Sequence, residues 1–164
     1  MEGISGRGAL GLGISESALT AINVTLFLIL ADGTERDWTY KAVAGGFGNG
    51  APENGEYTTD TYRDRSRNNG DYSEGMNKDG VGFSFNLNPQ FDTGRTDLRI
   101  HPDGNNEGTR GCIGMSGEKM ILTNFRDNIK NIIQVKRSIS TKVMINNNPN
   151  NDGRNGGKIP NVNE

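Results

Sequence analysis

One stretch near the N-terminus, in which every second residue is apolar, constrains the fold more than any other feature of this sequence. Its apolar positions are Ile22, Val24, Leu26, Leu28 and Leu30. A period of two predicts a half-buried strand, and the Asp32-Gly33 pair that follows predicts a tight hairpin turn. We therefore expect a strand over 21–30 and an antiparallel return strand over 34–43.

The rest of the chain also favours strands. Its 164 residues suffice for one domain, and 24 of them are glycine while only 32% are hydrophobic, which predicts a modest core with many loops. Further strands are expected at 56–59, 81–87, 97–100 and 142–145. One helix is expected after Cys112, with Ser116 as its cap. Its apolar positions recur at helical spacing: Ile121, Phe125, Ile129 and Ile132 or Ile133. The expected fold class is mainly β with one packed α-helix.

Composition divides the chain into three parts. Residues 1–20 are rich in glycine and are expected to form a flexible leader. Residues 21–146 form the expected folded domain, in which 60–80 have almost no apolar side chains and predict a polar loop, either a lid that flanks the site or a solvated insertion. Residues 147–164 are rich in asparagine and are expected to be a disordered tail.

Charge and cysteine content exclude several classes of function. Lys and Arg number 18 against 20 Asp and Glu, a net charge of −2, which argues against nucleic-acid binding through a basic face. No apolar run approaches the roughly twenty residues of a membrane-spanning helix, so no membrane span is expected. One Cys and one His cannot close a structural zinc site unaided, and no metal or cofactor is expected. Residues 1–7 lack the pattern of a secretory signal, which favours export by a secretion machine or as part of a longer chain.

The single His and the single Cys lie eleven residues apart, in the segment 100–115. His101 is expected at the end of a strand, and Cys112 follows a Gly- and Asn-rich loop just before the helix. A thiol of ordinary pKa is mostly protonated at neutral pH, so a nucleophilic Cys needs a neighbouring base such as imidazole. Taken alone, the pair leaves open a structural role, with Cys112 as a small buried hydrophobe.

Two motifs resemble one known family. The stretch His101, then Thr109-Arg110-Gly111-Cys112-Ile113-Gly114-Met115, resembles the signature of the L,D-transpeptidase (YkuD-type) catalytic domain, in which a His precedes Ser/Thr-His-Gly-Cys-hydrophobic-Arg/Asn. The segment 50–57 is similar to the Thr-Pro-x-Gly-x-Phe turn and strand of that family. The resemblance covers about 24–145 and implies a mixed-sheet or β-sandwich fold of L,D-transpeptidase type.

The resemblance also implies roles for individual residues. Cys112 would be the nucleophile that attacks a peptidoglycan stem peptide to give a thioester, and His101 would be the general base, oriented by the Pro102 carbonyl. Backbone amides of Gly111 and Cys112 would stabilise the oxyanion, and the cation of Arg110 beside the thiol would favour the thiolate. Transfer to an amine gives a crosslink or amino-acid exchange, and transfer to water gives L,D-carboxypeptidase activity.

The motif departs from the classical one in ways that suggest a divergent branch. Arg110 stands where classical members have a second His, Gly114 stands where they have Arg or Asn, and the spacing between His101 and Cys112 is shorter. These changes resemble branches that include antibacterial effectors, which implies action in a rival's periplasm or cell wall and an immunity or inhibitor protein as a partner. Two alternatives remain open: a peptidoglycan endopeptidase that uses the same residues, and a non-catalytic wall-binding module.

Overall fold

The computed structural model describes residues 8–9, 19–48, 50–104, 106–145, 148 and 150. The strands are β1 (Gly8–Ala9), β2 (Leu19–Ile29), β3 (Glu35–Ala44), β4 (Gly55–Asp64), β5 (Asn77–Lys78), β6 (Val81–Pro89), β7 (Arg99–Pro102), β8 (Ile113–Met115) and β9 (Ile139–Val143). The helices are the short 3₁₀ turn η1 (Glu74–Met76) and α1 (Lys119–Lys136). The expected class, mainly β with one packed α-helix, is confirmed.

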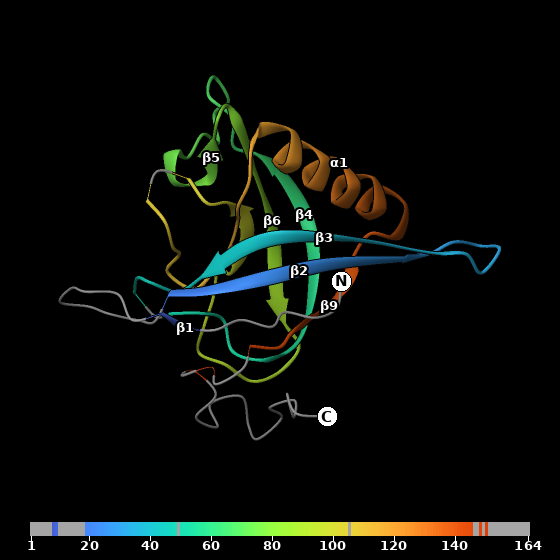
Figure 1. Ribbon diagram of the computed structural model, residues 1–164, viewed down its shortest axis with the longest axis horizontal. Helices are drawn as coiled ribbons and strands as arrows, with labels where there is room; N and C mark the ends of the chain where they lie inside the picture. Colours follow the sequence, from blue (N-terminus) through green and yellow to red (C-terminus); the bar gives the residue numbers. More distant parts are fainter. Residues whose placement is uncertain are drawn as a thin grey trace.

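The strands form one curled mixed sheet, in which β2 and β3 cross in front of β4 and β6 (Figure 1). The strand order is β1-β2-β3-β8-β7-β6-β4-β9, with β5 paired to β6 at the side. Among the described strands, β7 and β8 form the one parallel pair, and the other pairs are antiparallel. A parallel pair needs a crossover rather than a hairpin, and here the loop over 103–112 supplies it.

The N-terminal hairpin forms as predicted. Strand β2 pairs with β3 from Thr20 opposite Ala44 to Ile29 opposite Glu35. In the turn, Gly33 adopts a φ of +82°, which a residue without Cβ reaches at little cost. Its N–H donates to Leu30 O at 2.9 Å, and this bond closes the turn.

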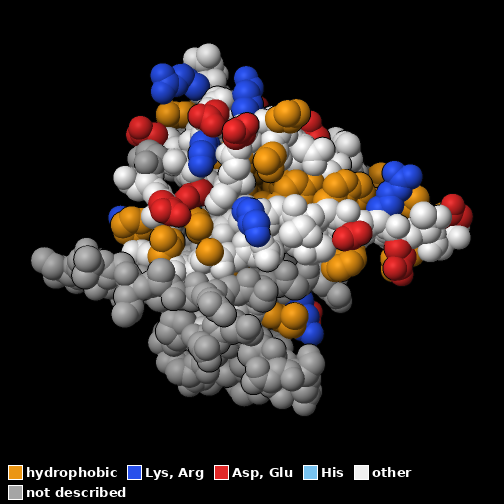
Figure 2. All heavy atoms as spheres, viewed as in Figure 1, with side chains coloured by type: hydrophobic (Ala, Val, Ile, Leu, Met, Phe, Trp, Pro, Cys, Tyr) orange, Lys and Arg blue, Asp and Glu red, His pale blue; other side chains and the backbone are white. Residues whose placement is uncertain are grey.

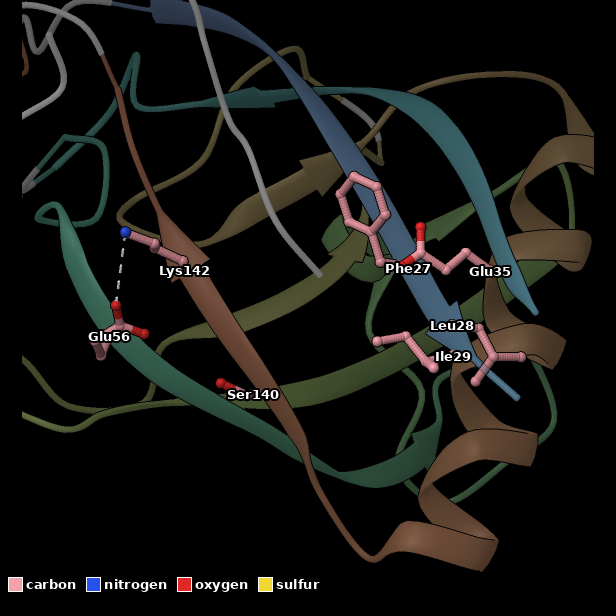
Figure 3. A pocket seen from close by; sticks show the side chains of 7 residues that line it. All are labelled: Phe27, Leu28, Ile29, Glu35, Glu56, Ser140 and Lys142. Carbon is pink, nitrogen blue, oxygen red and sulfur yellow. Dashed lines mark ion pairs between the residues drawn. The ribbon is translucent and has the colours of Figure 1, made fainter. Parts of the chain in front are cut away.

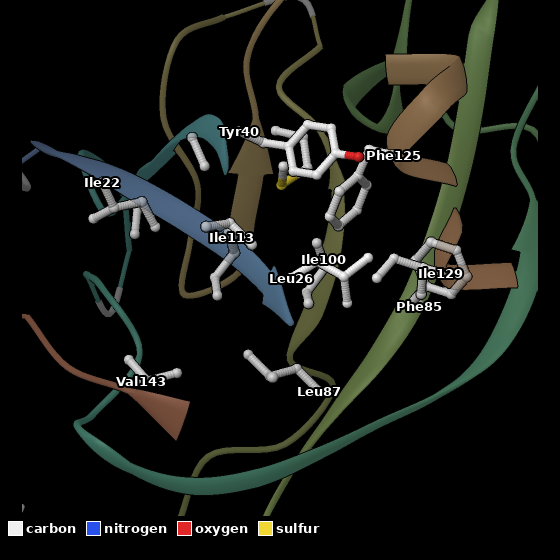
Figure 4. Close-up of a cluster of buried hydrophobic side chains, with 14 of the residues drawn as sticks. Ile22, Leu26, Tyr40, Phe85, Leu87, Ile100, Ile113, Phe125, Ile129 and Val143 are labelled. Atoms are coloured by element: carbon white, nitrogen blue, oxygen red, sulfur yellow. The ribbon is translucent and has the colours of Figure 1, made fainter. Parts of the chain in front are cut away.

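The core lies inside the curl of the sheet, against α1 (Figure 4). Phe125 of α1 is fully buried, and its ring packs against those of Tyr40, Phe83 and Phe85. The alternating positions of β2 at Ile22, Val24 and Leu26 are buried on the same side, as the period of two predicts. One apolar core therefore joins the two halves of the curled sheet.

The helix begins later than the sequence suggested. Its N-cap is Glu118, without a side-chain capping hydrogen bond, so the assignment of Ser116 as the cap was wrong. Ser116 instead continues the pairing of β8 with β3, because its N–H donates to Lys41 O at 2.9 Å. Strand β8, which the sequence analysis missed, occupies the residues between Cys112 and the helix.

A β-bulge at Thr61 changes the direction in which β4 presents its side chains. Thr61 has a φ of +50°, and the register with β6 shifts between Asp60 and Tyr62. An extra residue in one strand reverses the alternation beyond it. As a result Tyr62 packs against the core, whereas Arg63 lies on the opposite face of the sheet.

Two segments differ from the loop and tail that composition suggested. The first part of 60–80 completes β4, and its last part forms η1 and β5, because pairing with β6 satisfies its backbone groups. Asn148 is buried, and its amide donates to Pro52 O at 2.7 Å and Asn54 Oδ1 at 3.0 Å. Asn150 likewise donates to Ala51 O. In the expected leader, the structure describes β1 and the first two residues of β2. The other residues of the expected leader and tail lie outside the described residues.

Acidic and basic side chains are interspersed over the face shown in Figure 2, without a large area of one sign. This mixture is in keeping with the nearly balanced composition. Within the described residues, no helix combines the length and the apolar character that crossing a membrane requires.

Candidate active site

The parallel pairing of β7 and β8 brings His101 and Cys112 to the same face of the sheet. Ile100 lies opposite Ile113, and His101 lies opposite Gly114. Both isoleucines point into the core with 0% exposure, so His101 and Cys112, each one position away, lie on the other face. A strand spacing of about 4.8 Å and a rise of about 3.3 Å per residue place their Cα atoms about 8 Å apart. This distance is within reach of an imidazole and a thiol.

The imidazole of His101 is buried and held in one orientation. Its Nδ1 lies 2.7 Å from Pro102 O, which is the contact expected from the resemblance. A carbonyl accepts only from a protonated nitrogen, so this bond leaves the Nε2 lone pair free in the neutral ring. Burial lowers the pKa of His101 to about 4, and the nearby Arg99 and Arg65 cations act in the same direction. At neutral pH the ring is therefore an uncharged base.

The thiol of Cys112 is half-buried and uncharged at rest. Burial raises the pKa of the Cys112 thiol, against the opposing effects of the Arg99 N–H and of the Arg99 and Arg95 cations. Its Sγ lies 4.0 Å from Asp97 O, at the entry to β7. At rest both the thiol and the imidazole are thus neutral, and each side chain hydrogen-bonds to a backbone carbonyl.

Two buried polar side chains hold the loop that connects β7 to Cys112. Thr109 Oγ1 donates to Cys112 O at 2.5 Å and accepts from the Gly45 N–H at 3.2 Å. Asp103 Oδ1 accepts from the Gly108 N–H at 3.1 Å. Thr109 thereby fixes the backbone of Cys112 to the end of β3, and Asp103 fixes the start of the loop to its end.

Gly111 occupies a position where a side chain would strain the backbone. Its φ is +129°, and a Cβ there would overlap the guanidinium of Arg95. That guanidinium donates to Ala51 O at 2.5 Å and to Gly50 O at 3.0 Å. The turn at 50–57 therefore acts on the Cys112 loop through Arg95, which explains how a segment distant in sequence contributes to the site.

The expected effect of Arg110 on the thiol is not seen. Arg110 is exposed and packs beside Gly48, and the cations that act on the Cys112 thiol are Arg99 and Arg95. Sequence reasoning overlooked both. Arg99 had one available signal, since a residue two positions before His101 on a strand must share its face.

Two cavities flank the described part of the molecule. A cavity of about 300 Å³ is lined by Thr109 and Arg110 of the Cys112 loop, together with Phe47, Gly75, Asn106 and Gly108. A larger one, of about 490 Å³, lies between the ends of β2 and β9 (Figure 3). Phe27, Ile29 and the ion pair of Lys142 with Glu56, at 3.9 Å, line the larger cavity, which contains neither His101 nor Cys112. Of these two, the smaller cavity adjoins the loop that leads to Cys112, although Cys112 and His101 do not line it.

Comparison with known proteins gives no relative for this chain, since no family model, no curated protein and no solved structure matches it. The chemistry of the site is therefore derived from its own geometry and from the motifs of the sequence.

Proposed function

We propose that this chain is a cysteine acyltransferase with an L,D-transpeptidase type of fold, which acts on the stem peptides of peptidoglycan. The observation that supports this most is the register of β7 and β8, which places His101 and Cys112 on one face of the sheet. The ring is oriented by Pro102 O, and the thiol is partly open to solvent. A base and a nucleophile so arranged are the minimum that thioester chemistry requires.

The first half of the reaction forms the thioester. Rotation about the Cα–Cβ bond of Cys112 brings Sγ toward His101 Nε2, which takes the thiol proton as sulfur attacks the peptide carbonyl carbon. The N–H groups of Gly111 and Cys112 stabilise the resulting oxyanion. The carbon–nitrogen bond then breaks, and the imidazolium of His101 returns the proton to the leaving amine.

The second half releases the acyl group. An acceptor amine, or water, gives its proton to His101 Nε2 and attacks the thioester carbonyl, and the carbon–sulfur bond breaks. Cys112 leaves as the thiol after it recovers the proton from the ring. An amine acceptor gives a crosslink or an exchanged terminal residue, whereas water gives L,D-carboxypeptidase activity, which the partial exposure of Cys112 favours.

The substrate places the site of action in a bacterial periplasm or cell wall. The divergent motif around Cys112 favours an exported antibacterial effector, and the partner of such an effector would be an immunity or inhibitor protein that covers the site. Hydrolysis of a peptide bond within a crosslink, the endopeptidase alternative, would use the same two residues.

One observation favours a second candidate, a non-catalytic wall-binding module. The pKa of the Cys112 thiol is raised by burial, and Sγ lies against Asp97 O rather than against the ring. An inert thiol in that position would alkylate slowly at neutral pH, at a rate independent of His101. A catalytic thiol would instead lose reactivity when His101 becomes Gln.

The deciding experiment is incubation of the protein with purified tetrapeptide fragments, with and without an added D-amino acid, followed by mass spectrometry of fragments and intact protein. We expect loss or exchange of the terminal residue, and a protein species heavier by the acyl fragment. Cys112→Ala abolishes both signals, and His101→Gln lowers the rate by at least about a hundredfold. Arg36→Gln, an exposed change on β3, is the matched control, and we expect it to keep wild-type activity.

Unchanged fragments, combined with alkylation of Cys112 that is insensitive to His101→Gln, would refute the acyltransferase proposal. Products from internal crosslinks only, with terminal residues intact, would instead identify an endopeptidase. Circular dichroism of each variant at 25 °C verifies that a lost activity is not a lost fold.

A further inference from the structure

The face of the sheet that carries His101 and Cys112 also carries a cluster of arginines. Arg99 precedes His101 by two residues on β7, and Asn86 of β6 pairs with it. Next along the sheet, Arg63 of β4 pairs with Ser84 of β6. Arg65 follows β4, and its Nε donates to Ser84 Oγ at 3.0 Å. The three arginines thus come from β7 and from the end of β4, the two strands that flank β6.

Most hydrogen bonds of this cluster go to neutral acceptors rather than to carboxylates. Arg63 donates to Asn86 Oδ1 at 2.9 Å, and Arg65 donates to Ser84 and to the Asp71 carbonyl, which are all neutral acceptors. Arg99 has one ion pair, with Asp97 at 3.2 Å, but the Asp97 side chain is 79% exposed, so solvent screens it. Among the described residues, Arg99 Nε is buried without a hydrogen-bond partner.

Mutual repulsion in the cluster is consistent with its geometry. The pKa of Arg65 is lowered, first by burial and then by the positive charge of Arg99, while the Asp71 carboxylate opposes this shift and Arg63 adds a smaller contribution to it. The folded chain holds these cations together although each would be more stable apart. Such an arrangement favours the binding of an anion, which would reduce the repulsion between the cations. A carboxylate suits this site because a guanidinium binds it through two parallel hydrogen bonds.

We propose that Arg99 and Arg65 form a carboxylate-binding subsite beside Cys112, which selects acyl-donor peptides that carry a free carboxylate next to the bond that is broken. This inference deepens the proposed function and rests on it for the identity of the peptide. Two carboxylates of a stem peptide have the right chemistry: the terminal one of the leaving residue, and the one on the side chain of the diamino acid.

The bulge at Thr61 determines which side chains of β4 share the face of this subsite. Without it, the alternation of β4 would direct Arg63 into the core and Tyr62 to the polar face. The irregularity therefore supplies both an apolar contact for the core and a further cation, Arg63, on the face that carries the subsite.

The subsite can be tested without any peptidoglycan substrate, because the chain has a single cysteine. Iodoacetate and iodoacetamide alkylate the same thiolate and differ in charge, so the ratio of their rates is independent of the thiol pKa. We expect this ratio to be about tenfold higher in the folded protein than in the protein unfolded in urea, and to fall as salt is raised.

Arg99→Gln and Arg65→Gln each lower the ratio severalfold, and the double variant brings it to the unfolded value. Arg99→Lys, which keeps a charge but not the planar fork, retains most of the ratio. Arg36→Gln is the matched control, since it removes an exposed arginine on β3. A ratio equal to that of the unfolded chain, or one unaffected by the Arg99 and Arg65 variants, would overturn the subsite.

Calorimetric titration of the Cys112→Ala protein with three tetrapeptides shows which of the two carboxylates of the stem peptide binds to the subsite. One has both carboxylates free, one is amidated at the terminus, and one is amidated on the diamino-acid side chain. One of the amidated peptides binds about tenfold more weakly, and Arg99→Gln abolishes that difference. Equal binding of all three overturns the selectivity, whereas a high alkylation ratio without any peptide binding supports the anion site and overturns the peptidoglycan proposal.

Discussion

Strands β6 and β7 have two faces of opposite character, and the contrast between them separates the residues that stabilise the fold from those of the candidate site. One face points into the core and consists of Phe83, Phe85, Leu87 and Ile100. The other consists of Ser84, Asn86, Arg99 and His101. The same backbone hydrogen bonds support both faces, so the difference lies entirely in what the side chains bury.

The core face stabilises the fold because its apolar side chains leave water and pack closely against α1. The polar face is expected to cost stability, because burial removes water from the imidazole of His101 and from the guanidinium of Arg65. Retaining such residues next to a well-packed core is typical of a site whose chemistry requires them. The two faces should therefore respond differently to substitution.

The largest expected effect lies on the core face. Phe125→Ala removes a ring that contacts three other aromatic rings, and we expect the free energy of unfolding to fall by about 3 to 5 kcal/mol. Urea denaturation followed by fluorescence or circular dichroism measures it. Ile121→Ala, on the exposed side of α1, is the control and should cost far less. A loss below about 1 kcal/mol for Phe125→Ala would contradict the position of the core.

The second effect, on the polar face, depends on pH. Because burial lowers the pKa of His101 from 6.5 to about 4, the unfolded chain binds a proton before the folded one does. Above about pH 6.5 the ring is neutral in both states and does not lower the free energy of unfolding. As pH falls toward 4, the unfolded chain takes up the proton first, and the free energy of unfolding falls by up to about 3 kcal/mol. The Arg99 and Arg65 cations, which face the ring, remain charged throughout this range.

The measurement compares wild type with His101→Gln by urea denaturation between pH 7 and 4.5. Burial raises the pKa of Asp103, which stabilises the fold as pH falls, so only the difference between the two proteins isolates His101. Parallel pH dependences for the two proteins would show that the imidazole is not buried as described.

The third effect concerns the loop that joins the two faces at Cys112. Gly111→Ala places a Cβ on the Arg95 guanidinium and forces a φ of +129° on a residue that avoids it. We expect a loss of about 2 kcal/mol in unfolding free energy, together with a larger loss of tetrapeptide turnover. Gly94→Ala is the control, because nothing lies near a Cβ at that position. Equal behaviour of the two variants would show that Arg95 does not constrain the Cys112 loop.

The smallest effect is a gain. Thr61 is β-branched and has a φ of +50° at the bulge, a conformation that asparagine adopts more readily. Thr61→Asn should stabilise the protein by about 0.5 kcal/mol, as thermal denaturation would show. The same change at Thr39, an exposed residue of β3, is the control and should be neutral or destabilising. Destabilisation at Thr61 would mean that the bulge is not strained.

Most of the regular elements were predictable from the sequence. The alternation over 22–30 and the Asp32-Gly33 pair predicted the first hairpin, and the spacing of Phe125 and Ile129 predicted α1, because periodicity reports directly which face of an element is buried. The segment from His101 to Cys112 was also recognisable as a candidate site, since the two residues are unique in the chain.

Other features depend on contacts between distant segments, and no local pattern reports those. Ser116 has the chemistry of a helix cap, but pairing with β3 takes its N–H. Strand β8 is three residues long and becomes a strand only because β3 and β7 lie on either side of it. Asn148, within a segment of disordered composition, is buried because Pro52 and Asn54 offer it hydrogen-bond partners.

The identity of the candidate nucleophile and base was thus encoded locally, in residue types and their spacing. The strand register that brings His101 and Cys112 to one face, and the bulge that places Arg63 on the polar face of the sheet, emerge only when the sheet closes around its core. The physical reason is that periodicity determines which side of a strand is apolar, whereas the positions opposite one another on neighbouring strands are set by the packing of the whole sheet.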